Sequence, residues 1–254
     1  MNNSIMHRLI YNNPPKYKTH NLYREYLRKS TSYCCAYCTL SESESPGATF
    51  NIDHFKPKTL FPDLVAECEN LRYSCPRCNS YKGDLWISET LGCLRDCKSC
   101  TNKLCHTNIE RFIDTLTEDP AEAMYLGKDD KIYAMNGSFP AKYTIKYLRL
   151  NRVQLIKVRH VRRFIDDWFA ELSRELKCKG EKFRSIEEEY SVFLKSRNIE
   201  EICMEGKDKI YFETICIMYE MIILQIKNSI MLIRCEIDRL KCMIDYRFGN
   251  DEIY

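Results

Sequence analysis

Side chains that bind metals and transfer protons are concentrated between Cys35 and Asn79. Two Cys-x-x-Cys pairs stand in this stretch, Cys35 with Cys38 and Cys75 with Cys78. Each pair can place two thiolates on one tight turn, and four thiolates complete a closed tetrahedral zinc shell. A closed shell leaves no position for a reactant, so a zinc ion held in this way would be structural.

The residues suited to chemistry lie between the two pairs and directly after the second one, at Asp53, His54 and Asn79. On an extended segment neighbouring side chains point to opposite faces, so one can bind a metal while the other addresses a water molecule from another side. An imidazole with an unperturbed pKa of about 6.5 can take a proton at neutral pH. The alternative is a zinc ribbon that only organises a loop or binds a partner.

This pattern resembles the HNH, or ββα-metal, endonucleases, in the subset that carries two zinc knuckles. The resemblance implies that His54 is the general base, that Asp53 and Asn79 hold a catalytic Mg²⁺ or Mn²⁺ ion, and that Asn70 braces the intervening loop. The last position is Asn79 rather than His, a variant that resembles the zinc-containing phage junction resolvases. The implied activity is hydrolysis of phosphodiester bonds in nucleic acid, with DNA as the usual substrate of the family.

Contact with a nucleic-acid backbone must come from local basic patches, because the net charge is only +3. Lys82, just after the motif, is expected to contact phosphates. Between residues 141 and 163 the chain carries eight Lys or Arg residues and no Asp or Glu. A solvated surface is the alternative interpretation of such a run. Its candidates for phosphate contact are Lys142, Lys146 and Arg149, which share a helical face, and Arg152.

A second cysteine group follows the motif. Its spacings permit another tetrahedral zinc site, with His106 competing for the fourth position, or else scattered free thiols. The cysteines of this group are Cys93, Cys97, Cys100 and Cys105.

The C-terminal part of the chain predicts one long helix. Apolar residues recur there with the four-three spacing of a coiled-coil seam. We expect this seam to dock onto a second copy or another protein, and a core helix of an intramolecular bundle is the alternative. Further apolar residues off the seam, including Ile217, Met221 and Leu224, predict burial on several sides, whereas Glu220 and Lys227 argue against a membrane span. The seam comprises Phe212, Cys216, Tyr219, Ile223, Ile226, Ile230, Ile233, Ile237, Leu240 and Ile244.

We therefore expect an α+β fold with two domains. Residues 1–118 would form a zinc-stabilised HNH nuclease domain. Residues 119–254 would form a helical domain with a small hairpin, a basic helix that Gly180 ends and the long heptad helix. Met1 to Ile10 contains no long apolar run or cleavage site, which favours a cytoplasmic protein with reduced thiols.

Residues 143–152 and the predicted hairpin before them carry a second resemblance. They resemble the HNH nucleases of Septu-like antiphage defence systems, including those attached to retrons. That resemblance implies an ABC-type ATPase as a protein partner.

Overall fold

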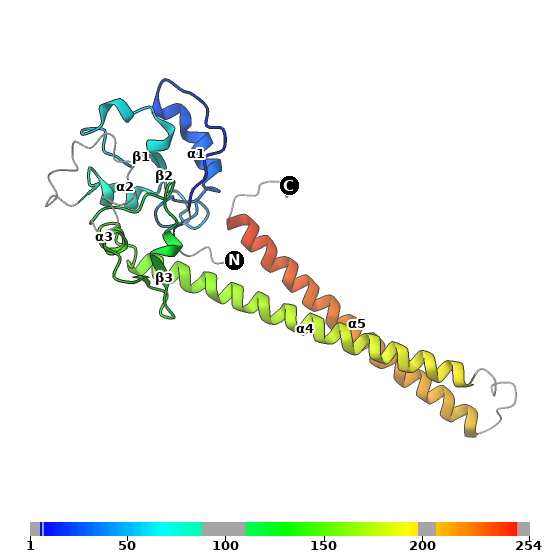
Figure 1. Ribbon diagram of the computed structural model, residues 1–254. Helices are drawn as coiled ribbons and strands as arrows, with labels where there is room; N and C mark the ends of the chain where they lie inside the picture. The colour runs from blue at the N-terminus through cyan, green and yellow to red at the C-terminus, as the bar shows by residue number, and fades with distance from the viewer. Residues whose placement is uncertain (1–5, 7, 88–109, 198–206, 248–254) are drawn as a thin grey trace. The chain divides into compact units, whose positions relative to one another are not determined.

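The computed structural model describes residue 6 and residues 8–87, 110–197 and 207–247 (Figure 1). Short strands and helices come first and two long helices follow, so the predicted α+β class is confirmed. The chain forms two compact units, Met1–Arg163 with Asp245–Tyr254, and Phe164–Ile244. This division differs from the predicted boundary after residue 118, because the segment that follows contributes side chains to the core of the first unit.

The metal motif lies on an antiparallel hairpin followed by a helix. Strand β1 (Asn51–His54) pairs with β2 (Leu71–Ser74), and Asp53 stands directly opposite Arg72. Helix α2 (Pro76–Lys82) follows β2 after a single residue. The described chain therefore contains the strand, strand, helix order that was expected for an HNH module.

The residues at the two ends of helix α2 explain where it begins and where it ends. The Cys75 Sγ atom accepts a hydrogen bond from the Cys78 backbone N–H at 3.4 Å and so caps the helix, and Pro76 occupies the first turn, where a missing N–H costs nothing. Gly83 follows the helix with φ of 47°, in the region that favours glycine. The helix is short because Cys75 of the second Cys-x-x-Cys pair fixes its first residue and Gly83 ends it.

A second small hairpin and a helix complete the first unit. Their apolar residues Met124, Ile132 and Tyr143 join the same buried cluster as Leu71 of β2 and Phe112. Several single-turn helices and one short α-helix complete the N-terminal half of the unit. The remaining elements are η1 (His20–Tyr23), α1 (Arg24–Ser30), η2 (Pro62–Leu64), η3 (Cys68–Asn70), η6 (Pro120–Glu122), β3 (Met124–Leu126), β4 (Ile132–Ala134) and α3 (Phe139–Tyr147).

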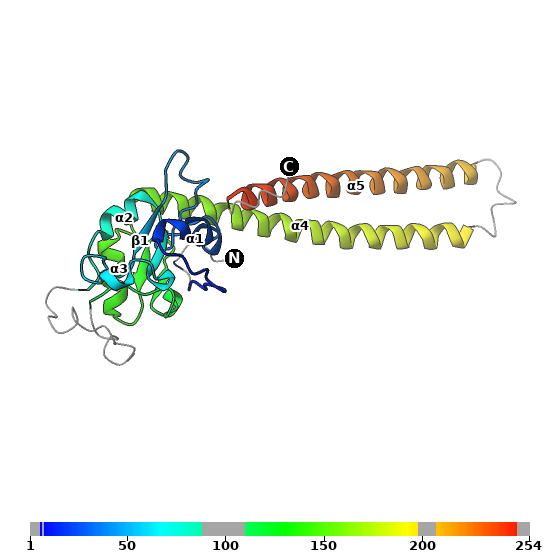
Figure 2. The same ribbon diagram turned by 90° about the horizontal axis from the view of Figure 1, so that it is seen from above.

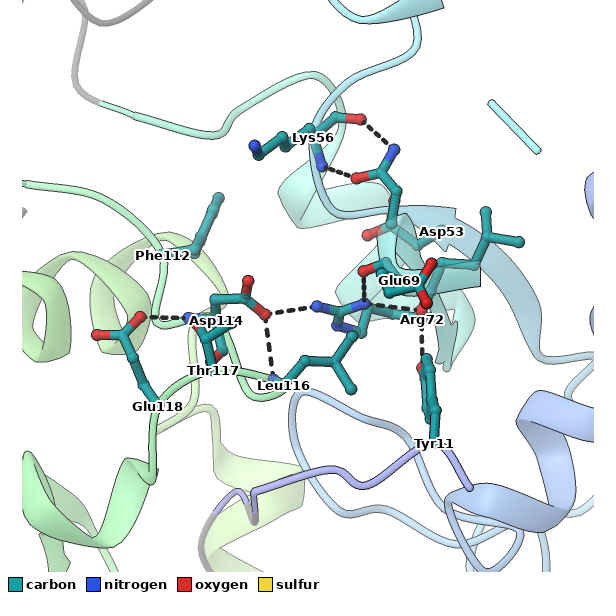
Figure 3. Close-up of polar contacts among 12 residues, drawn as sticks. Tyr11, Asp53, Lys56, Glu69, Arg72, Phe112, Asp114, Leu116, Thr117 and Glu118 are labelled. Carbon is teal, nitrogen blue, oxygen red and sulfur yellow. Dashed lines mark hydrogen bonds and ion pairs between the residues drawn. The ribbon is translucent and has the colours of Figure 1, made fainter. Parts of the chain in front are cut away.

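Arg72 of β2 joins three separate segments of the first unit (Figure 3). Its side chain is completely buried and forms an ion pair with Asp114. The guanidinium also donates to the backbone carbonyls of Glu69 and Leu71, at 2.7 and 2.9 Å, and the hydroxyl of Tyr11 donates to the same Leu71 carbonyl at 2.7 Å. The N-terminal segment, β2 and the loop at residue 114 are thereby tied together.

We predict that Asp114→Asn lowers the free energy of unfolding by about 3 kcal/mol, because it leaves the buried Arg72 charge without its counter-ion. Urea denaturation followed by circular dichroism measures this change. The matched control is Glu110→Gln, an exposed carboxylate, which should change stability by no more than about 0.5 kcal/mol. Equal effects of the two substitutions would show that the buried pair does not stabilise the unit.

The second unit is a helical hairpin formed by the later part of α4 (Val153–Arg197) and by α5 (Lys207–Arg247), which run side by side in opposite directions (Figures 1 and 2). Helix α4 passes through Gly180 without interruption, so the predicted break there is wrong. A glycine inside a helix costs only about 1 kcal/mol, which a helix of this length can absorb.

The predicted heptad seam of α5 faces α4 of the same chain. Phe193 of α4 stacks on Phe212, with ring centroids 5.3 Å apart, and Tyr190 stacks on Tyr219 at 5.1 Å. Every seam residue is at least partly buried. The expectation that this seam docks onto another molecule is therefore replaced by its alternative, an intramolecular contact.

The off-seam apolar residues of α5 are not buried, contrary to prediction. Ile217, Met221 and Leu224 are 56%, 65% and 60% exposed. The reason is geometric: one neighbouring helix covers one side of α5, and within the described residues of this unit no second helix covers the other. Lys209–Asp245 is long and apolar enough to cross a membrane by length and composition, which for a single helix is weak support for a membrane span.

Candidate active site

Four cysteines from two distant segments meet in one buried cluster. The Sγ atoms of Cys35, Cys38, Cys75 and Cys78 all lie within 4.8 Å of one another, and those of Cys38 and Cys75 are 3.8 Å apart. A tetrahedral zinc ion with Zn–S bonds of about 2.3 Å requires sulfur separations of about 3.8 Å. The cluster therefore fits a structural zinc ion. The neighbouring Cys34 is not part of this cluster, and its backbone forms an isolated β-bridge with Ser41.

The first knuckle is a tight turn attached to β2. The backbone N–H of Thr39 donates to the Cys35 carbonyl at 2.9 Å, and the N–H of Ala36 donates to the carbonyl of Tyr73 at 2.8 Å. Because Cys75 also caps α2, both knuckles are fixed to the elements that carry the candidate catalytic residues. Zinc binding would therefore set the position of α2 relative to the hairpin.

Arg152 lies against this cluster and not on a phosphate-binding surface. Its guanidinium donates to the Sγ atoms of Cys38, Cys75 and Cys78 at 3.6, 3.9 and 3.6 Å. Four thiolates around one zinc ion carry a net charge of −2, which a neighbouring cation offsets. The prediction that Arg152 contacts phosphate is corrected accordingly, because its side chain is used inside the unit.

His54 ends β1 with its ring oriented by the following loop. Its Nε2 atom lies 3.1 Å from the carbonyl oxygen of Val65, which can only accept, so Nε2 carries the proton and Nδ1 is the basic nitrogen. Asn70 holds this loop, because its side chain accepts from the Lys56 N–H at 2.8 Å and donates to the carbonyls of Lys56 and Leu64 at 3.0 and 3.2 Å. This arrangement fixes the tautomer that a general base at His54 requires.

The ring of His20, in η1, packs edge-on against His54 with centroids 5.1 Å apart. Burial lowers the pKa of His54, and the nearby His20 lowers it further. The sequence analysis missed His20. No spacing rule connects a histidine in an N-terminal turn with a strand residue more than thirty positions later.

Asp53 is nearly fully buried, and one of its carboxylate oxygens has two partners. The Tyr37 hydroxyl donates to Oδ2, and Lys82 Nζ lies 3.3 Å from the same oxygen. Lys82 is completely buried and also donates to the His54 carbonyl at 2.7 Å, so the prediction that it contacts phosphate is wrong. Burial raises the pKa of Asp53 and lowers the pKa of Lys82, and their ion pair opposes both shifts.

Asn79 lies one helical turn before Lys82 on α2, so both residues share a helix face. Because Lys82 reaches the backbone of His54, this face is turned towards β1. Among the residues that the structure describes, none bonds to Asp53 Oδ1 or to the Asn79 side chain. Carboxylate and amide oxygens are the ligands that Mg²⁺ and Mn²⁺ prefer, so this donor set fits a hard divalent cation.

The basic run divides into exposed and internal residues. Lys142, Lys146 and Arg149 are exposed on or just after α3, and the Arg149 guanidinium lies 4.7 Å from the ring of Tyr81 on α2. By contrast, the buried Arg162 binds Glu44 and Thr39. The second cysteine group, Cys93, Cys97, Cys100 and Cys105 with His106, lies outside the described residues.

Comparison with known proteins places this site in a recognised class. Residues 35–85 match the family described as HNH endonuclease. Over 49 residues the chain is 41% identical to the Septu protein PtuB of Bacillus thuringiensis, a match that covers 19% of this chain and 19% of that relative. No solved structure matches. The family match, the relative and the buried cysteine cluster together fit a zinc-containing HNH module.

We predict that Cys78→Ser removes one zinc ion per chain relative to the unsubstituted protein and unfolds the module, because three thiolates bind the ion more weakly than four. Metal analysis by mass spectrometry and circular dichroism measure the two effects. The control is Cys68→Ser, a buried cysteine outside the cluster, which should retain the full zinc content. Unchanged zinc in Cys78→Ser would exclude this cluster as the binding site.

Proposed function

We propose that the protein is a metal-dependent HNH endonuclease that hydrolyses phosphodiester bonds of nucleic acid. The observation that carries the proposal is His54, held through Nε2 beside Asp53 on a hairpin that a four-cysteine cluster braces. The match of residues 35–85 to the HNH endonucleases supports the same activity.

In this proposal each side chain has a separate task. His54 Nδ1 takes a proton from the attacking water, while the Val65 carbonyl holds the ring and stabilises the imidazolium that forms. Asp53 Oδ1 and the Asn79 amide oxygen would hold a divalent cation, and Tyr37 with Lys82 fixes the Asp53 carboxylate. A cation bound there supplies electrostatic stabilisation to the scissile phosphate and the leaving 3′-oxygen. The products are a 5′-phosphate and a 3′-hydroxyl.

We infer that α3 carries the main contact with the nucleic-acid backbone. Lys142, Lys146 and Arg149 are exposed, and the contact of Arg149 with Tyr81 links this basic surface to the active-site helix α2. Contacts of this kind neutralise phosphates without reading bases, so we expect little sequence specificity. DNA is the proposed substrate.

The similarity to a Septu protein supports a role in antiphage defence, and we propose that the protein acts in the bacterial cytoplasm. We propose that an ATPase partner controls access of the nuclease to its substrate, which would protect the host chromosome. The competing function is a zinc-stabilised adaptor that cleaves no nucleic acid. Substitution of His54 distinguishes the two functions, because only a nuclease would lose activity.

We predict that His54→Ala lowers the rate of phosphodiester cleavage in Mg²⁺ by at least about 100-fold, because the proton acceptor is lost. Gel analysis of labelled DNA measures the rate, while circular dichroism and zinc analysis show that the fold remains. The matched control is His160→Ala, an exposed histidine of α4, which should cleave normally. No cleavage by the unsubstituted protein with its native partners present, or equal cleavage by both variants, would favour the adaptor.

We predict that Lys142→Ala with Lys146→Ala weakens DNA binding and reduces the slope of log affinity against log salt by about 1.8, or about 0.9 for each lost phosphate contact. Fluorescence anisotropy over a salt series, performed in the His54→Ala background to prevent cleavage, measures the slope. Lys128→Ala, which removes an exposed charge from the turn between β3 and β4, should leave it unchanged. An unchanged slope in the double variant would remove α3 from the proposed interface.

A further inference from the structure

Helix α5 carries a second apolar seam that the intramolecular hairpin does not use. Its residues follow the same four-three spacing as the first seam but lie two positions earlier, which is about 200° around a helix. The two seams therefore occupy opposite sides of α5. All members of the second seam are exposed, and they are Ile210, Thr214, Ile217, Met221, Leu224, Asn228, Met231 and Cys235.

This exposure is unusual for its size and regularity. Ile210, Ile217, Met221, Leu224 and Met231 are each 56–65% exposed, whereas the first seam is partly or fully buried along its whole length. Isolated apolar residues on a surface need no explanation, but a long stripe made mostly of apolar residues marks an interaction site. A helix that is apolar on two opposite sides is typical of a bundle in which it has two neighbours.

We propose that the second seam packs against the same seam of a second copy of this chain, with the two α5 helices antiparallel about a two-fold axis. Such an interface is self-complementary, because each layer occurs twice. Met221 would then pack on the partner's Leu224, Thr214 on the partner's Met231, and Ile210 on the partner's Cys235. The inference concerns the second unit alone and does not depend on the proposed nuclease activity.

The charges beside the seam favour this occupant and this orientation. One flank of the seam carries Glu213, Glu220, Lys227 and Arg234, all exposed, so its first half is acidic and its second half basic. Antiparallel pairing places Glu220 beside the partner's Lys227 and Glu213 beside the partner's Arg234. A parallel pair would instead place Glu213, Glu220 and Lys227 beside Met218, Gln225 and Leu232, and Arg234 beside the partner's Arg239, with no opposite charge to meet.

Two features of the hairpin are compatible with this pairing. Glu220 accepts a hydrogen bond from Tyr190 of α4 at 3.3 Å, and Lys227 lies 5.3 Å from the ring of Phe183, also on α4. These contacts draw both side chains towards α4 and leave them exposed. Asn228 is the one amide in the seam, and in this register it lies opposite the partner's Ile217, so this layer contributes less to the interface than the apolar layers beside it.

The first test is the mass of the full-length protein in solution. Light scattering coupled to size exclusion should show a dimer, and Met221→Lys with Leu224→Lys should raise its dissociation constant more than about 100-fold, because four charges would enter the central layers. Both positions are exposed, so circular dichroism should be unchanged. The control is Glu188→Lys, a charge change at an exposed position of α4. A monomeric unsubstituted protein, or a dimer that resists the double variant, would overturn the proposal.

A charge-reversal cycle tests the orientation. Glu220→Lys and Lys227→Glu should each raise the dissociation constant about tenfold, because each creates two like-charge contacts across the two-fold axis. The combination of both should restore dimerisation, since every pair is again of opposite charge. Additive weakening in the double variant would overturn the antiparallel arrangement.

The competing occupant of an exposed apolar helix is a lipid surface, and flotation with vesicles of phosphatidylcholine and phosphatidylglycerol distinguishes it. The dimer should remain with the soluble fraction. A protein that floats with the vesicles through Met221 and Leu224 and stays monomeric without them would refute the second-copy interface in favour of membrane binding.

Discussion

The gathering of four cysteine thiolates is the constraint on which the first unit depends. It joins the turn at Cys35 to the start of α2 at Cys75, two segments that are far apart in the sequence. Since the turn is hydrogen-bonded to β2 and Cys75 caps α2, this one junction sets the distance between the hairpin and the helix. The proposed catalytic residues His54 and Asn79 lie on those two elements, so their separation is fixed by a metal site that takes no part in the chemistry.

Buried cationic side chains fix much of the remaining packing of the first unit. Lys82, Arg72 and Arg162 are almost completely buried, and each has a carboxylate partner. A charge removed from water is tolerated only when it is paired and hydrogen-bonded, so each of these contacts strongly restricts how its segments can pack. The same requirement explains why several residues of the basic run are used inside the first unit, and why the proposed nucleic-acid interface is limited to the exposed side of α3.

The second unit presents the opposite situation, a surplus of apolar surface. A hairpin of two helices can cover one side of each helix, and aromatic stacking between α4 and α5 uses that side. The remaining apolar residues of α5 have no cover within the described part of this unit. The favourable free energy of removing such a stripe from water makes it a natural interface.

Short-range spacing in the sequence was sufficient for the metal motif and the heptad seam, whereas the strand, strand, helix order was implied by the resemblance to the HNH endonucleases. The motif and the seam depend on ligands within one turn or on the period of a helix, which neighbouring residues determine. Only the tertiary structure decided that Lys82 and Arg152 point inwards, that His20 packs on His54 and that the seam of α5 faces its own chain. The direction of a charged side chain and the neighbour of a helix both depend on which distant segments pack together. The residues close by in the sequence do not determine this packing.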